Sequence, residues 1–94
     1  MDSEVRELLD KQAITEVLYR YSRAVDRGDE GLLRDCYHDD AVEDHGGAFL
    51  GPASDYIAAV RPALNGDRLM THTVTNVLIE LTGADLALSE CYYL

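Results

Sequence analysis

The 94-residue sequence contains no tryptophan, one phenylalanine, two prolines and two cysteines. The cysteines, Cys36 and Cys91, stand far apart and in no CxxC pattern. One interpretation is a disulfide between them, and the other is two reduced thiols. We favour two reduced thiols, because the acidic amino terminus is not a secretory signal. No apolar run approaches the ~20 residues that cross a membrane. We therefore expect a cytoplasmic chain with no membrane partner.

Basic residues are also scarce. The sequence has 8 Lys and Arg and 18 Asp and Glu, and its formal net charge is −10. A nucleic-acid binder needs a basic patch that replaces counterions on the phosphates, so this class of partner is excluded. An anionic membrane surface is disfavoured for the same reason. The sequence also lacks a Gly-rich phosphate loop, a GxSxG elbow and a dinucleotide fingerprint, and we predict no cofactor.

What is present fits one small globular domain over residues 1–94, since apolar residues make up 47% of the chain. Apolar positions recur with a period near 3.6 and predict an amphipathic helix over residues 3–27. Asp2 or Ser3 is its expected cap, and Gly28 stands where a left-handed residue ends a helix. The apolar stripe of this helix must pack on something large, such as a sheet.

The middle of the chain predicts shorter elements. Asp29 is a plausible cap for a second helix, and residues 41–44 and 49–50 favour two short strands. Ser54 is the expected cap of a third helix that extends to Leu64, whose last turn is kinked or frayed by Pro62.

The last third of the chain predicts a hairpin of two longer strands, residues 69–81 and residues 86–94, joined by a turn at residues 82–85. Alternation in the first strand places on one face His72, Val74, Asn76 and Leu78. A tight turn sets a register in which Cys91 lies opposite Asn76 and Tyr93 lies opposite Val74, so these two residues share the face of His72.

The final apolar strand has no closing polar turn after it. Natural proteins usually avoid an unpaired apolar edge. Either another chain covers this edge or the domain is truncated, and we favour truncation.

Asp26 is the first candidate for chemistry. Tyr19, Ser22 and Asp26 share one helix stripe, and the helix dipole disfavours an anion in the last turn by about 0.3–1 kcal/mol. This penalty indicates a role beyond helix formation. The alternative is a solvated carboxylate paired with Arg23 or Arg27.

His72 is the second candidate. The alternative is a structural histidine that is hydrogen-bonded and has no catalytic role. A face that combines His72, Asn76, Cys91 and Tyr93 with small apolar residues is more typical of a pocket lining than of a sealed core. If Asp26 reaches His72, the pair forms a general base.

A cluster of histidines and carboxylates lies at residues 38–45. His38, Asp40 and His45 follow no standard ligand spacing, and alternate residues of an extended segment point to opposite faces. We therefore predict no metal site and interpret the segment as a solvated helix end that leads into a strand.

Several of these pieces, in this order and spacing, resemble the SnoaL-like branch of the nuclear-transport-factor-2-like (NTF2-like) superfamily, the set containing scytalone dehydratase, hexachlorocyclohexane dehydrochlorinase and bile-acid 7α-dehydratase. The pieces that carry the resemblance are residues 14–26 of the long helix, Asp40-Ala41, Gly51-Pro52, His72 and Thr75-Asn76. Together they cover nearly the whole chain.

The resemblance implies a cone-shaped, cystatin-like α+β fold, with three helices packed on a curved, mostly antiparallel sheet around a deep pocket. It implies that Asp26 bonds His72, which removes a proton from the substrate, and that Tyr21 is a pocket tyrosine that bonds a substrate oxygen. The supporting substrate-binding candidates are Asn76, Tyr19, Cys91 and Tyr93. The family domain continues with further strands, so we expect this fold to be incomplete at its carboxyl end.

The leading hypothesis is a cofactor-independent lyase or isomerase, dehydratase-like, that acts on a small, largely apolar cyclic molecule. The second is a non-catalytic ligand-binding or subunit-assembly module on the same fold, like the small subunits of ring-hydroxylating dioxygenases. A weaker third is a metal-dependent hydrolase that uses His38, Asp40 and His45. A homo-oligomer, a dimer or larger, is expected by resemblance.

Overall fold

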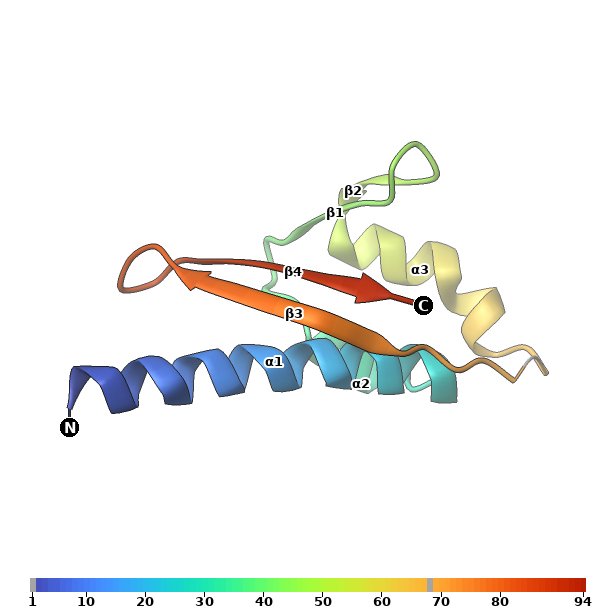
Figure 1. The fold of residues 1–94 in the computed structure, drawn as a ribbon. Helices are drawn as coiled ribbons and strands as arrows, with labels where there is room; N and C mark the ends of the chain where they lie inside the picture. The colour runs from blue at the N-terminus through green and yellow to red at the C-terminus, as the bar shows by residue number, and fades with distance from the viewer. Residues whose placement is uncertain (1, 68) are drawn as a thin grey trace.

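The computed structural model describes residues 2–67 and 69–94. Within these residues, three helices and two β-hairpins follow one another as α1 (Ser3–Arg27), α2 (Glu30–Asp35), β1 (Val42–Asp44), β2 (Leu50–Pro52), α3 (Ala53–Leu64), β3 (Val74–Leu81) and β4 (Ala87–Tyr93) (Figure 1). The mixture of helices and antiparallel strands agrees with the predicted α+β class. The Cα trace is elongated, 47 × 25 × 23 Å, because the long helix α1 runs along most of its length (Figure 1).

The two helices at the start of the chain have the predicted ends. Asp2 is the cap of α1, since its side chain accepts a hydrogen bond from the Glu4 N–H at 2.7 Å. Gly28 ends α1 in the left-handed region, with φ 66°. Asp29 caps α2 by accepting from the Leu32 N–H at 3.0 Å.

The predicted start of the third helix is wrong. The residue before α3 is Pro52, which has no capping side chain, and Ser54 is already the second residue of the helix. The Ala53 N–H at the start of α3 donates instead to the Ala41 carbonyl oxygen at 2.9 Å, and Pro52, with φ −57°, has no N–H of its own that needs a partner. Pro62 lies inside the last turn, and the helix continues to Leu64 because Leu64 is buried in the core.

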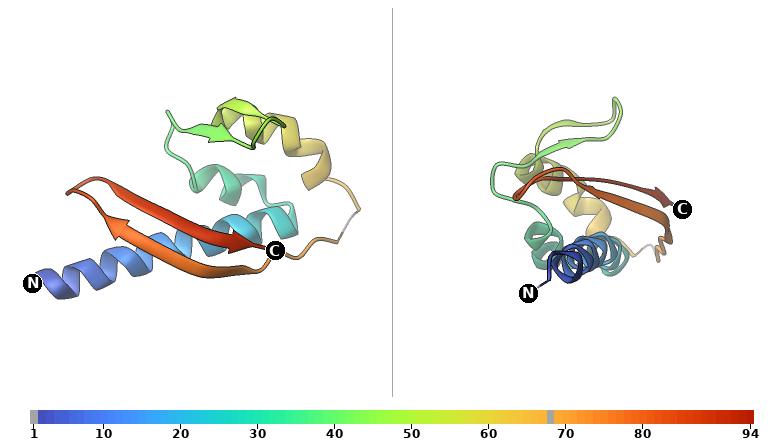
Figure 2. Two further views of the ribbon diagram at one scale, coloured as in Figure 1. Left: turned by 45° about the horizontal axis from the view of Figure 1, so that its top comes forward. Right: turned by 60° about the vertical axis from the view of Figure 1, so that its left-hand side comes forward.

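The strands form two separate two-stranded antiparallel sheets within the part of the chain described, β1–β2 and β3–β4, and not the single curved sheet that was expected. The reason is visible in Figures 1 and 2: β3–β4 lies along α1, whereas β1–β2 lies beside α3. Each hairpin is thus held by a different helix, and their edges do not pair.

Strand β3 begins at Val74, five residues later than predicted. Thr73 still exchanges two backbone hydrogen bonds with Leu94, at 2.9 and 3.0 Å, but the residues before Thr73 have run past the end of β4. His72 is therefore not a strand residue. It lies in residues 69–73, the stretch that leads into β3.

A β-bulge divides β3 and changes which side chains are buried. Val74 pairs with Tyr93 as predicted, but Leu78 pairs with Glu90, so Asn76 and Val77 together stand opposite Cys91. Asn76, the first residue of the bulge, has a φ of 54°. This left-handed conformation is the one that the first residue of a G1 bulge adopts.

The inserted residue reverses the alternation after Val74. Ile79 becomes buried, whereas Asn76 is exposed and Leu78 is 64% exposed. The prediction that Asn76 and Leu78 share the face of His72 and Val74 is wrong for this reason.

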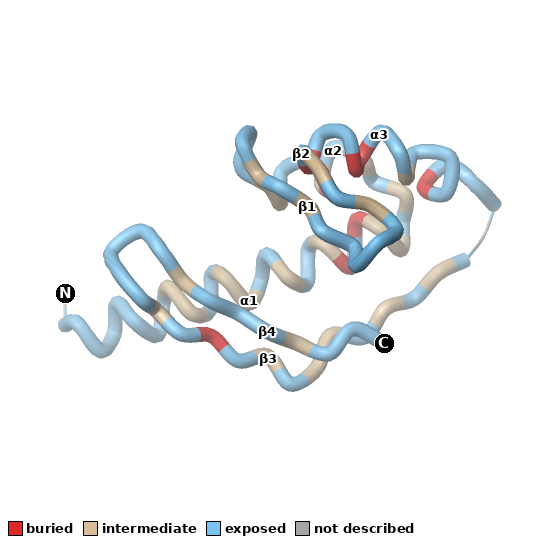
Figure 3. Tube along the Cα trace, turned by 90° about the horizontal axis from the view of Figure 1, so that it is seen from above, coloured by how far each residue is buried: buried red, intermediate tan, exposed pale blue. Residues whose placement is uncertain are grey.

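The core lies at the carboxyl-terminal half of α1, where that helix meets α2 and α3 (Figure 3). Its buried members are Ala24, Leu33, Tyr56, Ile57 and Leu64. The first turns of α1 lie outside this core, and Val5, Leu8 and Leu9 are 46%, 68% and 48% exposed. The hairpin therefore covers only part of the predicted apolar stripe.

Gly28 gives a prediction for stability. A Cβ on Gly28 would lie 2.3 Å from the Leu64 carbonyl oxygen, whereas a Cβ on Gly46, which also has a positive φ, would meet nothing within 4 Å. Gly46→Ala should therefore cost about 1–2 kcal/mol of unfolding free energy, from the left-handed backbone alone. Gly28→Ala should cost roughly 1–3 kcal/mol more. Urea unfolding measures both, and equal losses would contradict the close approach of α1 and α3.

Candidate active site

Asp26 and His72 meet, although 45 residues stand between them in the sequence. Asp26 Oδ1 lies 2.5 Å from His72 Nδ1, and Asp26 Oδ2 accepts a hydrogen bond from the His72 backbone N–H at 2.9 Å. One carboxylate thus fixes both the ring and the main chain of His72. The side chains are 18% and 24% exposed, so this pair, called the dyad below, is sheltered but accessible.

The local chain explains why the dyad forms. Asp26 lies in the last turn of α1, and the segment that returns from α3 passes this end of the helix before β3 begins (Figure 1). The hydrogen bond from the His72 N–H gives the carboxylate a donor that offsets the unfavourable helix dipole. Arg23 and Arg27 line the pocket that contains the dyad, but among the described residues the ionic partner of Asp26 is His72.

Aromatic side chains connect the dyad with the interior. The Tyr93 ring stacks on the His72 ring, with centroids 4.4 Å apart and an interplanar angle of 13°. Tyr21 meets Tyr93 edge-on at 5.9 Å. These three rings form a continuous wall that runs from His72, before β3, through Tyr93 on β4 to Tyr21 on α1.

Three hollows adjoin this wall. The largest apolar one, about 340 Å³, is lined by Tyr21, Cys91 and Tyr93 among others. A pocket of about 290 Å³ contains the dyad, and a pocket of about 200 Å³ is shared by His72, Tyr21 and Tyr93. The dyad thus opens beside the apolar cavity and not inside it, with Tyr93 between the two.

Of the remaining predicted site residues, some line one of these hollows and one does not. Tyr19 is 49% exposed and lines the pocket of the dyad, and Cys91 lines the apolar cavity. Asn76 is exposed on the bulge and contributes to none of the three hollows. Buried Ser22, on the stripe of Asp26, lines the pocket of the dyad, and its Oγ has no hydrogen bond within residues 2–67 and 69–94.

A second histidine–carboxylate pair lies on the other side of Tyr21. His45 Nδ1 is 2.7 Å from Glu43 Oε1, and the Tyr37 hydroxyl donates to Glu43 Oε2 at 2.6 Å. Tyr56 OH lies 3.3 Å from His45 Nε2 and 3.0 Å from Tyr21 OH.

Sequence reasoning missed Glu43, Tyr56 and Tyr37. The available signal was the spacing of Glu43 and His45, since residues two apart in a strand share a face. Nothing local indicates Tyr56, because only tertiary packing brings α3 beside α1. His38 and Asp40 are exposed, and the described part of the chain contains no group of three or more His, Cys, Asp or Glu that could hold a metal.

The profile of the SnoaL-like domain family matches residues 6–94, which is nearly the whole chain. The chain belongs to the SnoaL-like domain family. This family, in the NTF2-like superfamily, includes polyketide cyclases and isomerases or dehydratases. Comparison with curated proteins and with solved structures finds no significant match.

In this SnoaL-like domain the cysteines Cys36 and Cys91 are free thiols, as expected. No helix in the described ranges is both long and apolar enough to cross a membrane.

Three tyrosines of the SnoaL-like site have raised pKa values. Burial is the largest cause for the pKa of Tyr21, followed by the hydrogen bond with Tyr56. Burial also raises the pKa of Tyr37, together with its hydrogen bond to Glu43, and the pKa of Tyr93, to which the charge of Asp26 adds. These phenols stay protonated near neutral pH and act as neutral hydrogen-bonding groups.

The raised values predict how stability depends on pH. Tyrosines of the unfolded chain lose protons near pH ~10, while the three site tyrosines of the folded protein retain theirs. The folded state then binds more protons, so the unfolding free energy is intact below pH ~10 and falls above it. Urea unfolding between about pH 8 and pH 11 measures the fall. Tyr21→Phe should make it shallower, and an unchanged slope in that variant would contradict the raised pKa of Tyr21.

Proposed function

We propose that this SnoaL-like domain is a cofactor-independent lyase or isomerase in which His72 removes a proton from a carbon atom of a small, largely apolar cyclic substrate. The observation that carries the proposal is the two-point hold of Asp26 on His72, at 2.5 Å to Nδ1 and 2.9 Å to the backbone N–H. It supports a base whose position and ring orientation are both fixed before substrate binds.

The geometry supports one tautomer of His72. An ionised Asp26 accepts only, so the neutral ring carries its proton on Nδ1 and leaves the lone pair on Nε2. Nε2 makes no hydrogen bond with the described residues and is therefore free to accept a proton. When it does so, the nearby carboxylate stabilises the imidazolium. This is the histidine–aspartate half of a hydrolase triad without a nucleophile, and we expect no covalent intermediate.

The apolar cavity supports the substrate class. Its volume of about 340 Å³ is at the lower end of the range for small-molecule sites, and aromatic and aliphatic side chains line most of it. Tyr93 borders both this cavity and the ring of His72, and the smaller pocket of about 200 Å³ is lined by His72, Tyr21 and Tyr93 together. The neutral Tyr21 hydroxyl at the same wall is suited to bond a substrate carbonyl or a leaving hydroxyl group.

The proposal is tested by exchange of carbon-bound hydrogen in deuterium oxide. Acetophenone, cyclohexanone and indanone are small ketones that contain a ring and have acidic C–H bonds beside the carbonyl, and NMR follows their deuteration. The wild-type protein should accelerate exchange of at least one ketone, and His72→Gln should lower the rate about 10²–10⁴-fold, the usual contribution of a general base. Asp26→Asn should also lower it, because the amide favours the wrong tautomer of His72.

The matched control is His38→Gln, the same substitution at an exposed histidine away from the dyad. It should retain the wild-type rate, and circular dichroism should show all three variants folded. Equal rates for His72→Gln and the wild type would refute the base. Tight binding of these ketones without exchange would favour the non-catalytic ligand-binding module instead.

A further inference from the structure

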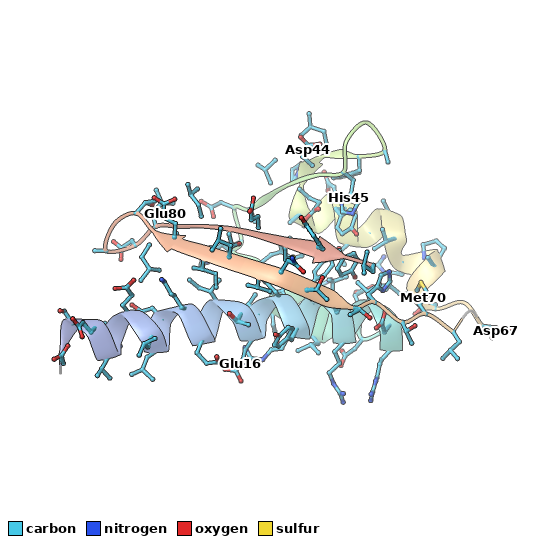
Figure 4. The ribbon with its side chains drawn as sticks, viewed as in Figure 1. Glu16, Asp44, His45, Asp67, Met70 and Glu80 are labelled. Atoms are coloured by element: carbon cyan, nitrogen blue, oxygen red, sulfur yellow. The ribbon has the colours of Figure 1, made fainter. Side chains whose placement is uncertain are left out.

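The ion-pair contact of His45 with Glu43 is followed by two hydrogen bonds that lead through Tyr56 to Tyr21. From Glu43 the contacts run to His45 at 2.7 Å, to Tyr56 at 3.3 Å and to Tyr21 at 3.0 Å. Three separate elements supply it: the β1–β2 hairpin, α3 and α1. His45 lies where this hairpin meets α3, as labelled in Figure 4. We refer to Glu43, His45 and Tyr56 as the relay.

The relay begins at Glu43, which accepts hydrogen bonds, and its last member, Tyr56, bonds Tyr21 at the cavity. Glu43 accepts from Tyr37 at one oxygen and faces His45 Nδ1 with the other, so it functions as an acceptor at both. Tyr21, at the other end, lines the apolar cavity of about 340 Å³ and the smaller pocket that it shares with His72. Between them, Tyr56 is buried and 7% exposed, so its hydroxyl cannot exchange partners freely with water.

Protonation of His45 reverses the bond between His45 and Tyr56 and, through it, the bond between Tyr56 and Tyr21, while Nδ1 carries its proton toward Glu43 in both states. An imidazolium donates from Nδ1 to Glu43 and from Nε2 to Tyr56. Tyr56 then uses its own proton to donate to Tyr21, and the Tyr21 proton is left to point at the cavity. Neutral His45 has its proton toward Glu43, so Nε2 accepts from Tyr56. Tyr56 in turn accepts from Tyr21, and Tyr21 presents only lone pairs to the cavity.

We propose that Glu43, His45 and Tyr56 are positioning residues that make Tyr21 a hydrogen-bond donor to a substrate oxygen when His45 is protonated. This inference rests on the proposed function and narrows its substrate: a small ring compound with a carbonyl or hydroxyl oxygen opposite the C–H bond that faces His72. Tyr21 keeps its proton throughout, consistent with its raised pKa, and the proton taken from carbon leaves through His72.

His45 is exposed enough to exchange protons with solvent, since 41% of its side chain is accessible. The titratable groups around it come from every neighbouring element. On β1 its partner is Glu43; the shared pocket adds Tyr21 from α1, Tyr56 from α3, His72 from the segment before β3 and Tyr93 from β4. Two histidines, His45 and His72, belong to this set, so the test must separate them.

Acetophenone and ethylbenzene are the probes, because they have similar size and only the ketone accepts a hydrogen bond. NMR titration gives both affinities over a pH series, and ring ¹⁵N shifts report the protonation of each histidine in the same sample. Acetophenone affinity should fall roughly 2–10-fold as His45 loses its proton, the range for one hydrogen bond. Ethylbenzene affinity should not change. The carbonyl ¹³C shift of bound acetophenone should move with His45 in the same way.

Variants separate the relay from its alternatives. His45→Gln and Tyr56→Phe should each abolish the pH dependence of acetophenone affinity, and Tyr56→Phe preserves the packed ring if the first variant perturbs the hairpin. Tyr21→Phe should give low, pH-independent affinity for the ketone. His38→Gln is the exposed-histidine control and should behave as wild type.

His72→Gln distinguishes this inference from the proposed function. It should lose hydrogen exchange yet keep the pH dependence of acetophenone binding, so either proposal can fail alone. The relay is overturned if the pH dependence survives in His45→Gln and Tyr56→Phe, if ethylbenzene shows the same dependence, or if ketone and hydrocarbon bind equally at every pH. Failure of both probes to bind would overturn the substrate class.

Discussion

The contact between Asp26 and His72 joins the last turn of α1 to the segment before β3, and the proposed chemistry of this SnoaL-like domain depends on it. One carboxylate in the last turn of α1 bonds the main chain and the ring of the segment that enters β3. The contact stands just before the start of the β3–β4 hairpin, which then lies along α1 (Figure 2). The same two hydrogen bonds orient an imidazole beside an apolar cavity. A residue that the helix dipole disfavours is thus retained where it gains two donors.

The site lies at the end of the molecule where the core is best packed. Ala24, Leu33 and Ile57 are buried there, whereas the far end of α1 is exposed. Rigid packing around Tyr21 and Tyr56 holds polar hydroxyl groups within an apolar surround, where hydrogen bonds are stronger and unpaired groups are costly. Two histidine–carboxylate pairs then approach the cavity wall from opposite sides. In the function that we propose, one side takes a proton and the other bonds a substrate oxygen.

Local sequence signals predicted the helices well and the hairpin less well. The caps Asp2 and Asp29 and the stop at Gly28 follow from side-chain chemistry within a few residues. The bulge at Asn76 depends on how β3 meets β4, and strict alternation could not reveal it. For the site, the contact of Asp26 with His72 was anticipated through family resemblance. The relay through Tyr56 was not, because three elements must come together before it exists.

The tautomer of His72 tests the central claim most directly. Proton and ¹⁵N NMR of the imidazole ring, with the His72 signals assigned by the His72→Gln variant, identify which nitrogen carries the proton in the neutral state. We expect a proton on Nδ1, shifted downfield by its hydrogen bond to Asp26, and its loss from that environment in Asp26→Asn. A proton on Nε2 in the wild-type protein, or a ring whose signals do not change in Asp26→Asn, would contradict it.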